Sequence, residues 1–293
     1  MTPAKAVFQA AGFVPGSTGS RFRLVSEPAD RLVRGTVIFV HGFAEEMNKS
    51  RRMAARMARL LAADGWRVVQ RDLCGCGDSS GEFVDASWAA WVDDIDTELA
   101  DAATDRPVWL WCLRAGALLA PAVLEERRHV NLLLWQPVLS GAQHLQQFLR
   151  LHAGARIVGA ASADWGASPM QRLRSGEPVE VGGYQLGPAL AMGLEQAVFA
   201  VPEHFAGRIA WFELSNDEAP ELSMPAARAI ERLSGAGLRA DTRVLRGPPF
   251  WQTQEIEECE ALLEQTLAEL RVPLRPSPPP EDAATNRGIR PAS

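Results

Sequence analysis

The sequence predicts an α/β fold in which helices cover both faces of a mostly parallel, doubly wound sheet. Short apolar segments recur from about residue 35 onward, and amphipathic helical segments separate them. Most apolar segments are hydrophobic at consecutive rather than alternate positions, which is typical of parallel strands buried on both faces. Alternation of such strands with helices predicts right-handed crossovers between parallel neighbours.

Each predicted element follows from its own pattern. The predicted strands are TVIFV (36–40), RVVQRDL (67–73), VWLWC (108–112), VNLLLW (130–135), IAWFEL (209–214) and TRVL (242–245). Apolar residues at helical spacing predict one helix around 53–61 and another around 88–99. A last helix is expected near 254–270, with Ile256 and Cys259 at the start of its apolar side.

The remaining segments predict how one domain, residues 1–272, is organised. The N-terminal 30 residues fit an antiparallel hairpin that turns at Pro15–Gly19 and forms an edge of the sheet. Residues 141–207 are rich in Gly, Pro and Ser, show no clear strand and fall between two parallel strands. An insertion of this length predicts a cap subdomain. The proline-rich, polar residues 273–293 are expected to be a disordered tail.

Composition and charge exclude several classes of protein. The 293 residues include 47% hydrophobic residues, enough for a large core, and 30 basic against 36 acidic residues give a net charge of −6. This acidic balance argues against nucleic-acid binding. The four cysteines are too few for a disulfide framework and lack zinc-ligand spacing, so neither a metal nor a cofactor is expected.

The N-terminal sequence and the longest apolar segment predict a cytoplasmic protein without a membrane span. No basic-then-apolar leader marks the N-terminus for secretion. The longest apolar segment, 108–124, is interrupted by an arginine, a glycine and a proline. A membrane helix needs roughly 20 residues without such interruptions.

Three motifs carry a resemblance to a known superfamily. GTVIFVHGF (35–43), DLCGCGDSSG (72–81) and WLWCLRAGA (109–117) each follow or contain a predicted strand. This succession is similar to the α/β-hydrolase superfamily over about residues 30–270. The resemblance implies that the loop at Gly42 and Phe43 supplies an oxyanion-hole amide and that 109–117 forms the nucleophile elbow, G-x-S-x-G. It also places the insertion as a cap over the active site.

Four segments carry a narrower resemblance. FAEEMNKSRRMA (43–54), GCGDSSG (75–81), CLRAGA (112–117) and PFWQTQEI (249–256) occur in this order along the chain. Together they resemble the exosortase A system-associated hydrolase 2 family. The resemblance implies a bacterial protein linked to exopolysaccharide and exosortase loci, and an exopolysaccharide-system protein as a partner.

The elbow lacks its nucleophile. Cys112 stands at the first glycine of the motif, Arg114 at the serine and Gly116 at the second glycine. An arginine side chain stays protonated and has no lone pair with which to attack a carbonyl carbon. Cys112 is expected to be a small core residue, with a displaced thiol nucleophile as the less favoured alternative.

The histidine of the expected triad is also missing. The superfamily order is Ser, then Asp or Glu, then a His after the last strand. No histidine follows 242–245, and Phe250 and Trp251 stand in that loop. Asp217, after the strand 209–214, remains as the acid. We therefore do not expect the ordinary Ser-His-Asp reaction.

One hypothesis is a non-catalytic or weakly catalytic protein that binds an anionic or glycosidic small molecule, or a partner protein. Arg114 and the amides of the following helix would suit an anionic small molecule, and Trp251 could stack on a carbohydrate-like one. Alternatively, Arg114 pairs with Glu45 or Glu46 and fixes the elbow. The two roles are compatible.

The other hypothesis is a hydrolase or acyltransferase with a non-serine mechanism. Asp217, Glu45, Glu46 or His41 would then act as acid or base, and Arg114 would stabilise developing negative charge. For His41 the favoured alternative is structural, since hydrogen bonds from this residue would orient the loop at Gly42.

Overall fold

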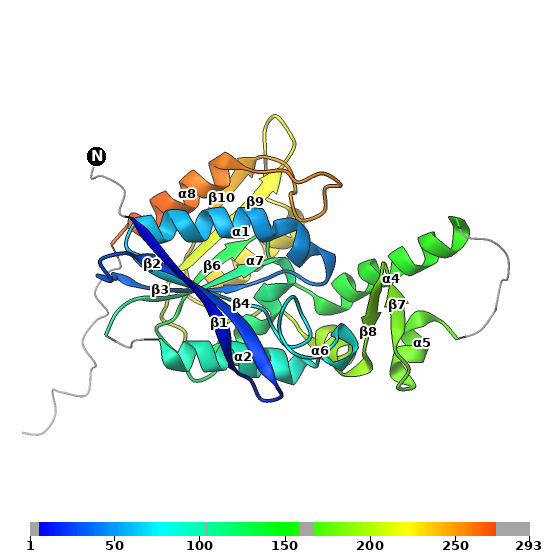
Figure 1. Ribbon diagram of the computed structural model, residues 1–293. Helices are drawn as coiled ribbons and strands as arrows, with labels where there is room; N and C mark the ends of the chain where they lie inside the picture. The colour runs from blue at the N-terminus through cyan, green and yellow to red at the C-terminus, as the bar shows by residue number, and fades with distance from the viewer. Residues whose placement is uncertain (1–5, 103–104, 159–166, 274–293) are drawn as a thin grey trace, which may run out of the picture.

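The computed structural model describes residues 6–102, 105–158 and 167–273, and one large sheet forms its centre (Figure 1). Its strands are β1 (Val7–Pro15), β2 (Ser20–Pro28), β3 (Gly35–Val40), β4 (Trp66–Arg71), β5 (Val108–Leu113), β6 (Asn131–Trp135), β9 (Ile209–Ser215) and β10 (Ala240–Arg246). They lie in the order β1-β2-β4-β3-β5-β6-β9-β10. The β1–β2 hairpin joins β4 in antiparallel fashion, and the other strands are parallel. The predicted strands and hairpin are confirmed.

Helices cover both faces of the sheet. They are α1 (Glu45–Ala63), α2 (Trp88–Asp101), α3 (Ala120–Leu124), α7 (Met224–Gly235), α8 (Glu260–Arg271) and the short 3₁₀ helices η1 (Phe83–Asp85) and η2 (Arg114–Leu119). α1 and α8 pack on one face, where Met53 and Met57 are fully buried, and α2, α3 and α7 pack on the other. Among the described helices, none is both long and apolar enough to cross a membrane.

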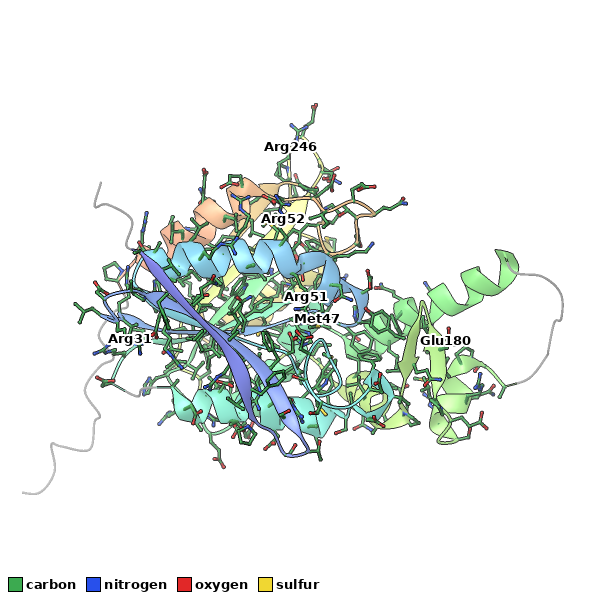
Figure 2. All side chains as sticks on the ribbon, viewed as in Figure 1. Arg31, Met47, Arg51, Arg52, Glu180 and Arg246 are labelled. Atoms are coloured by element: carbon green, nitrogen blue, oxygen red, sulfur yellow. The ribbon has the colours of Figure 1, made fainter. Side chains whose placement is uncertain are left out.

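The predicted start of the last helix is wrong. α8 begins at Glu260, and Ile256 lies before it with 68% of its surface exposed. Ion pairs from Arg52 and Arg56 of α1 hold Glu258, so the segment before the helix lies along α1 instead of coiling (Arg52 is labelled in Figure 2). The backbone amide of Cys259 also donates to the sulfur of Met53.

The described part of residues 141–207 folds as a small helical unit that carries a hairpin. Its elements are α4 (Gly141–Val158), α5 (Pro169–Arg174), β7 (Val179–Val181), β8 (Tyr184–Leu186) and α6 (Pro188–Gln196). The hairpin corrects the expectation that this insertion has no strand. Gly182 and Gly183 form its turn with φ of 58° and 86°, which glycine adopts readily. The expected disordered tail, apart from Pro273, lies outside the described residues.

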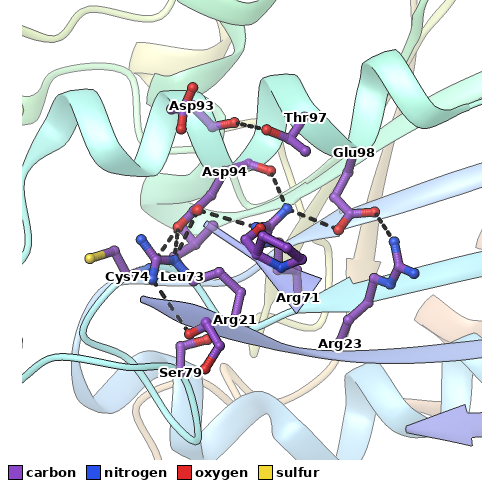
Figure 3. Close-up of polar contacts among 12 residues, drawn as sticks. Arg21, Arg23, Arg71, Leu73, Cys74, Ser79, Asp93, Asp94, Thr97 and Glu98 are labelled. Atoms are coloured by element: carbon purple, nitrogen blue, oxygen red, sulfur yellow. Dashed lines mark hydrogen bonds and ion pairs between the residues drawn. The ribbon is translucent and has the colours of Figure 1, made fainter. Parts of the chain in front are cut away.

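A buried group of ion pairs fastens the antiparallel edge to α2 (Figure 3). Nε of Arg21 lies 2.9 and 2.8 Å from the two carboxylate oxygens of Asp94. Arg71 lies 3.4 Å from the same carboxylate and donates a 3.0 Å bond to Glu98. The amide of Cys74 also donates to Asp94, at 2.8 Å. The side chains of Arg21, Arg71, Asp94 and Glu98 are at most 3% exposed. Each of these buried charges is therefore stabilised by its ion-pair partner in place of water.

Replacing the shared carboxylate should destabilise the protein strongly. Asp94→Ala leaves Arg21 without its buried partner, and we expect the free energy of unfolding to fall by about 3–5 kcal/mol. Urea denaturation followed by circular dichroism would measure the loss. The exposed neighbour Asp93 provides the matched control, because Asp93→Ala should change stability by no more than about 0.5 kcal/mol. Equal effects of the two substitutions would contradict the prediction.

Candidate functional site

The elbow keeps its sharp geometry although its central residue is an arginine. Arg114 follows β5 directly and has φ of 52°, in the left-handed region that costs a non-glycine residue roughly 1–2 kcal/mol. Gly116 packs tightly against the end of β3. A Cβ there would lie 2.8 Å from the carbonyl oxygen of Val40 and 2.9 Å from that of His41. The residue at position 114 is therefore presented at the carboxyl edge of the sheet.

The expected helix N-terminus behind Arg114 is not present. The chain continues as the six-residue 3₁₀ helix η2, and the five-residue α3 follows it. An anion site at a helix end needs the aligned amides of a longer α-helix. Any positive charge at the elbow therefore comes from the Arg114 side chain itself.

Arg114 is held between a carboxylate and an aromatic ring. Its Nε donates a 3.0 Å bond to Oε1 of Glu46, in the first turn of α1. The guanidinium lies over the indole of Trp251, 5.2 Å from its centroid, while Nη1 makes only a 3.5 Å contact to the carbonyl of Gln136. Among the described residues, none hydrogen-bonds Nη2. Of the two sequence alternatives for the ion pair, Glu46 is the partner and Glu45 is not.

A histidine from the insertion, residues 141–207, joins this pair. His144 of α4 places Nε2 4.0 Å from Oε2 of Glu46, and that oxygen is buried without a hydrogen-bond partner among the described residues. Burial lowers the pKa of His144, as does the charge of Arg114, while Glu46 raises it. The imidazole is therefore mainly neutral at neutral pH. The superfamily places its triad histidine after the last strand. His144 lies before the last strands, so this order could not identify it.

The second carboxylate fastens the cap to α1. The hydroxyl of Tyr184, in β8, donates a 2.9 Å bond to Oε2 of Glu45, and Asn48 donates to the same hydroxyl at 2.8 Å. Burial and this carboxylate raise the pKa of Tyr184. The run from Glu45 to Lys49 lies within α1, which begins ahead of the helix predicted around 53–61.

These side chains surround one pocket of about 430 Å³. It is lined by the predicted residues Glu45, Glu46, Arg114 and Trp251, together with Lys49 and His144. Phe43 of the expected oxyanion loop also lines it, and Trp251 is only 5% exposed beneath the guanidinium, so its ring is not an open stacking surface. The volume is within the range of roughly 300–1,000 Å³ that small-molecule sites occupy.

Three predicted site residues, His41, Gly42 and Asp217, do not line this pocket. His41 is buried, with Nδ1 2.7 Å from the carbonyl of Gly42, and its Nε2 accepts from the amide of Leu73 at 3.4 Å. Burial lowers its pKa. These contacts fit the structural alternative for His41. Asp217 is exposed beyond β9 and accepts a 2.6 Å bond from the hydroxyl of Ser215, so the surviving acid does not reach the elbow.

Neither a thiol nucleophile at Cys112 nor a metal site is found among the described residues here. Cys112 is fully buried in the core, and burial raises the pKa of its thiol, which keeps it protonated. Within the described ranges, no group of three or more His, Cys, Asp or Glu side chains could hold a metal ion.

Comparison with solved structures identifies the class of fold. A ferulic acid-bound Est1E from Butyrivibrio proteoclasticus aligns with a TM-score of 0.59 and 15% identity, covering 89% of this chain and 98% of that one. A Saccharomyces cerevisiae monoglyceride lipase aligns at 0.58 and 10%, covering 92% and 96%. A Bacillus coagulans carboxyl esterase aligns at 0.57 and 16%, covering 89% and 97%. The protein has the α/β-hydrolase fold.

The family follows from the sequence itself. Residues 32–178, half of the chain, match the family described as serine aminopeptidase, S33. This chain belongs to that family. A search of curated proteins finds no match to this chain.

The electrostatic arrangement predicts how His144 titrates. We expect its midpoint to lie below 6.5, to fall further in Glu46→Gln and to rise in Arg114→Ala, because the carboxylate favours the imidazolium and the guanidinium opposes it. An NMR titration, assigned with His144→Gln, would measure these shifts. The exposed His129 provides the control resonance. Because its pKa is lower in the folded than in the unfolded chain, His144 should also reduce stability as the pH falls below about 6.5. Shifts of the opposite sign would contradict the geometry.

Proposed function

We propose that this protein binds a small polar molecule, anionic or glycosidic, under its cap without turning it over. The observation that carries the proposal is Arg114 at the elbow, paired through Nε with Glu46 and facing the pocket. The superfamily motif places the attacking serine at this position. Among the described residues that line the pocket, none carries a hydroxyl or thiol.

The biological setting that we propose is exopolysaccharide assembly. The four segments that resemble the exosortase A system-associated hydrolase 2 family support it, and three of them, 43–54, 112–117 and 249–256, contribute side chains to the pocket. A protein of that system is the partner we propose alongside the small molecule. The named activities of the fold neighbours are esterase and lipase activities, which supports a small-molecule site at this edge of the sheet.

A second candidate function, hydrolysis or acyl transfer by a non-serine mechanism, is favoured by His144. Its neutral imidazole can accept a proton, and Glu46 and Arg114 lie beside it. In such a reaction His144 would activate water, and Arg114 would stabilise the developing oxyanion.

Turnover assays separate the two candidates. We expect a serine-directed organophosphonate to leave the protein unlabelled, and esters and thioesters to hydrolyse no faster than in buffer. Stoichiometric labelling of a serine would overturn both candidates. Turnover that is lost in both His144→Gln and Arg114→Ala, but kept in Arg59→Ala, would establish the enzyme instead. Arg59 lies exposed on α1 and serves as the matched arginine control.

A further inference from the structure

The hydrogen bonds already made inside the pocket limit which ligand it can take. Both carboxylates are engaged. Glu45 accepts from Tyr184, and Oε1 of Glu46 accepts from Arg114. The remaining oxygen of Glu46 is sealed from solvent beside His144. Of the four carboxylate oxygens, Oε1 of Glu45 alone is neither hydrogen-bonded to a described residue nor sealed from solvent.

Two of the charged side chains that line the pocket, Arg114 and Lys49, still offer donors. Nη2 of Arg114 has no hydrogen-bond partner among the described residues, and Nη1 makes only its 3.5 Å contact to Gln136. These two nitrogens form the end of the guanidinium fork, which matches the two oxygens of a carboxylate. Lys49 donates to the carbonyl of Thr253 at 2.7 Å, and an ammonium group has two further donors.

The charge of the pocket favours a monoanion over a dianion. Glu45 and Glu46 balance Lys49 and Arg114, so the four charged side chains sum to zero. A dianion such as a phosphate monoester would bring two charges close to both carboxylates, and this repulsion opposes binding. A monoanion brings half that charge and can still occupy both nitrogens of the fork.

Three aromatic side chains and the amides of Gln147 and Gln252 complete the lining of the pocket. Phe43 and Phe148 meet edge to face with their centroids 5.1 Å apart, and both line the pocket, as does Trp251. Burying hydrocarbon against such side chains contributes about 25 cal/mol per Å².

We infer that the pocket takes a monocarboxylate with an apolar body, whose carboxylate pairs with the Nη1–Nη2 edge of Arg114. This inference rests on the proposed function and names the ligand class of the same site. The Glu46 pair and the Trp251 ring already fix the guanidinium, so little side-chain entropy is lost on binding. Phe43 and Phe148 then contact the hydrocarbon part.

Four ligands with the same eight-carbon chain test the inference by isothermal titration calorimetry at neutral pH. They are octanoate, methyl octanoate, octyl phosphate and octyl glucoside, each kept below its micelle concentration. We expect octanoate to bind at least about tenfold more tightly than the other three, because only octanoate is a monocarboxylate. It should also shift the NMR resonance of His144, which lines the pocket.

The outcomes distinguish this inference from the proposed function. If octyl phosphate or octyl glucoside binds most tightly and shifts the His144 resonance, the monocarboxylate is overturned and the proposed function stands. If methyl octanoate binds as tightly as octanoate, the carboxylate makes no specific contact and the inference is overturned. If none of the four ligands binds, both fall.

Variants place the carboxylate. Arg114→Ala should weaken octanoate binding roughly 10- to 100-fold, as expected for loss of a charge-assisted pair, without changing the affinity for methyl octanoate. Glu46→Gln should strengthen octanoate binding by a few fold, because it removes a negative charge next to the ligand. Arg59→Ala is the control and should bind octanoate like the native protein. Weaker binding in Glu46→Gln, with its circular dichroism unchanged, would contradict the assigned position.

Discussion

The ion pair between Arg114 and Glu46 is the interaction on which the rest of the site depends. It joins the turn after β5 to the first turn of α1, and both side chains are 17% exposed. A pair in this intermediate environment is less screened than a surface pair and less costly than a fully buried one. The same contact uses Nε, leaves the other two nitrogens of the guanidinium without a carboxylate partner among the described residues, and places Glu46 beside His144.

The backbone conformation around this pair is determined by the fold and not by the side chain at position 114. Arg114 has φ of 52°, and Gly116 leaves no room for a Cβ against β3. These features bring the chain sharply from strand to helix whatever residue stands at the corner. An elbow can therefore lose its nucleophile without losing its shape, which is why likeness of fold says little about turnover here.

Local patterns were sufficient to predict the sheet, because its strands are continuous apolar segments and its first hairpin has a clear turn. The resemblance to the α/β-hydrolase superfamily singled out Arg114, Glu45, Glu46 and Trp251, which the structure gathers around one pocket. The role of His144 could not be predicted, since it depends on how α4 packs over the elbow, a contact between segments distant in sequence. The start of α8 was missed for a similar reason: α1 holds the segment before it.

Tyr184, the one tyrosine in the sequence, ties the hairpin of the insertion to the mouth of the pocket through Glu45 and Asn48. The same carboxylate lines the cavity and anchors the hairpin, so the two tasks are mechanically linked. A ligand that draws Glu45 into the pocket breaks its hydrogen bond with the Tyr184 hydroxyl, whereas a ligand that leaves Glu45 in place preserves that bond. Ligand binding in the pocket and attachment of the hairpin thus depend on the same carboxylate, that of Glu45. The absorbance of Tyr184 reports on this contact without interference from other tyrosines.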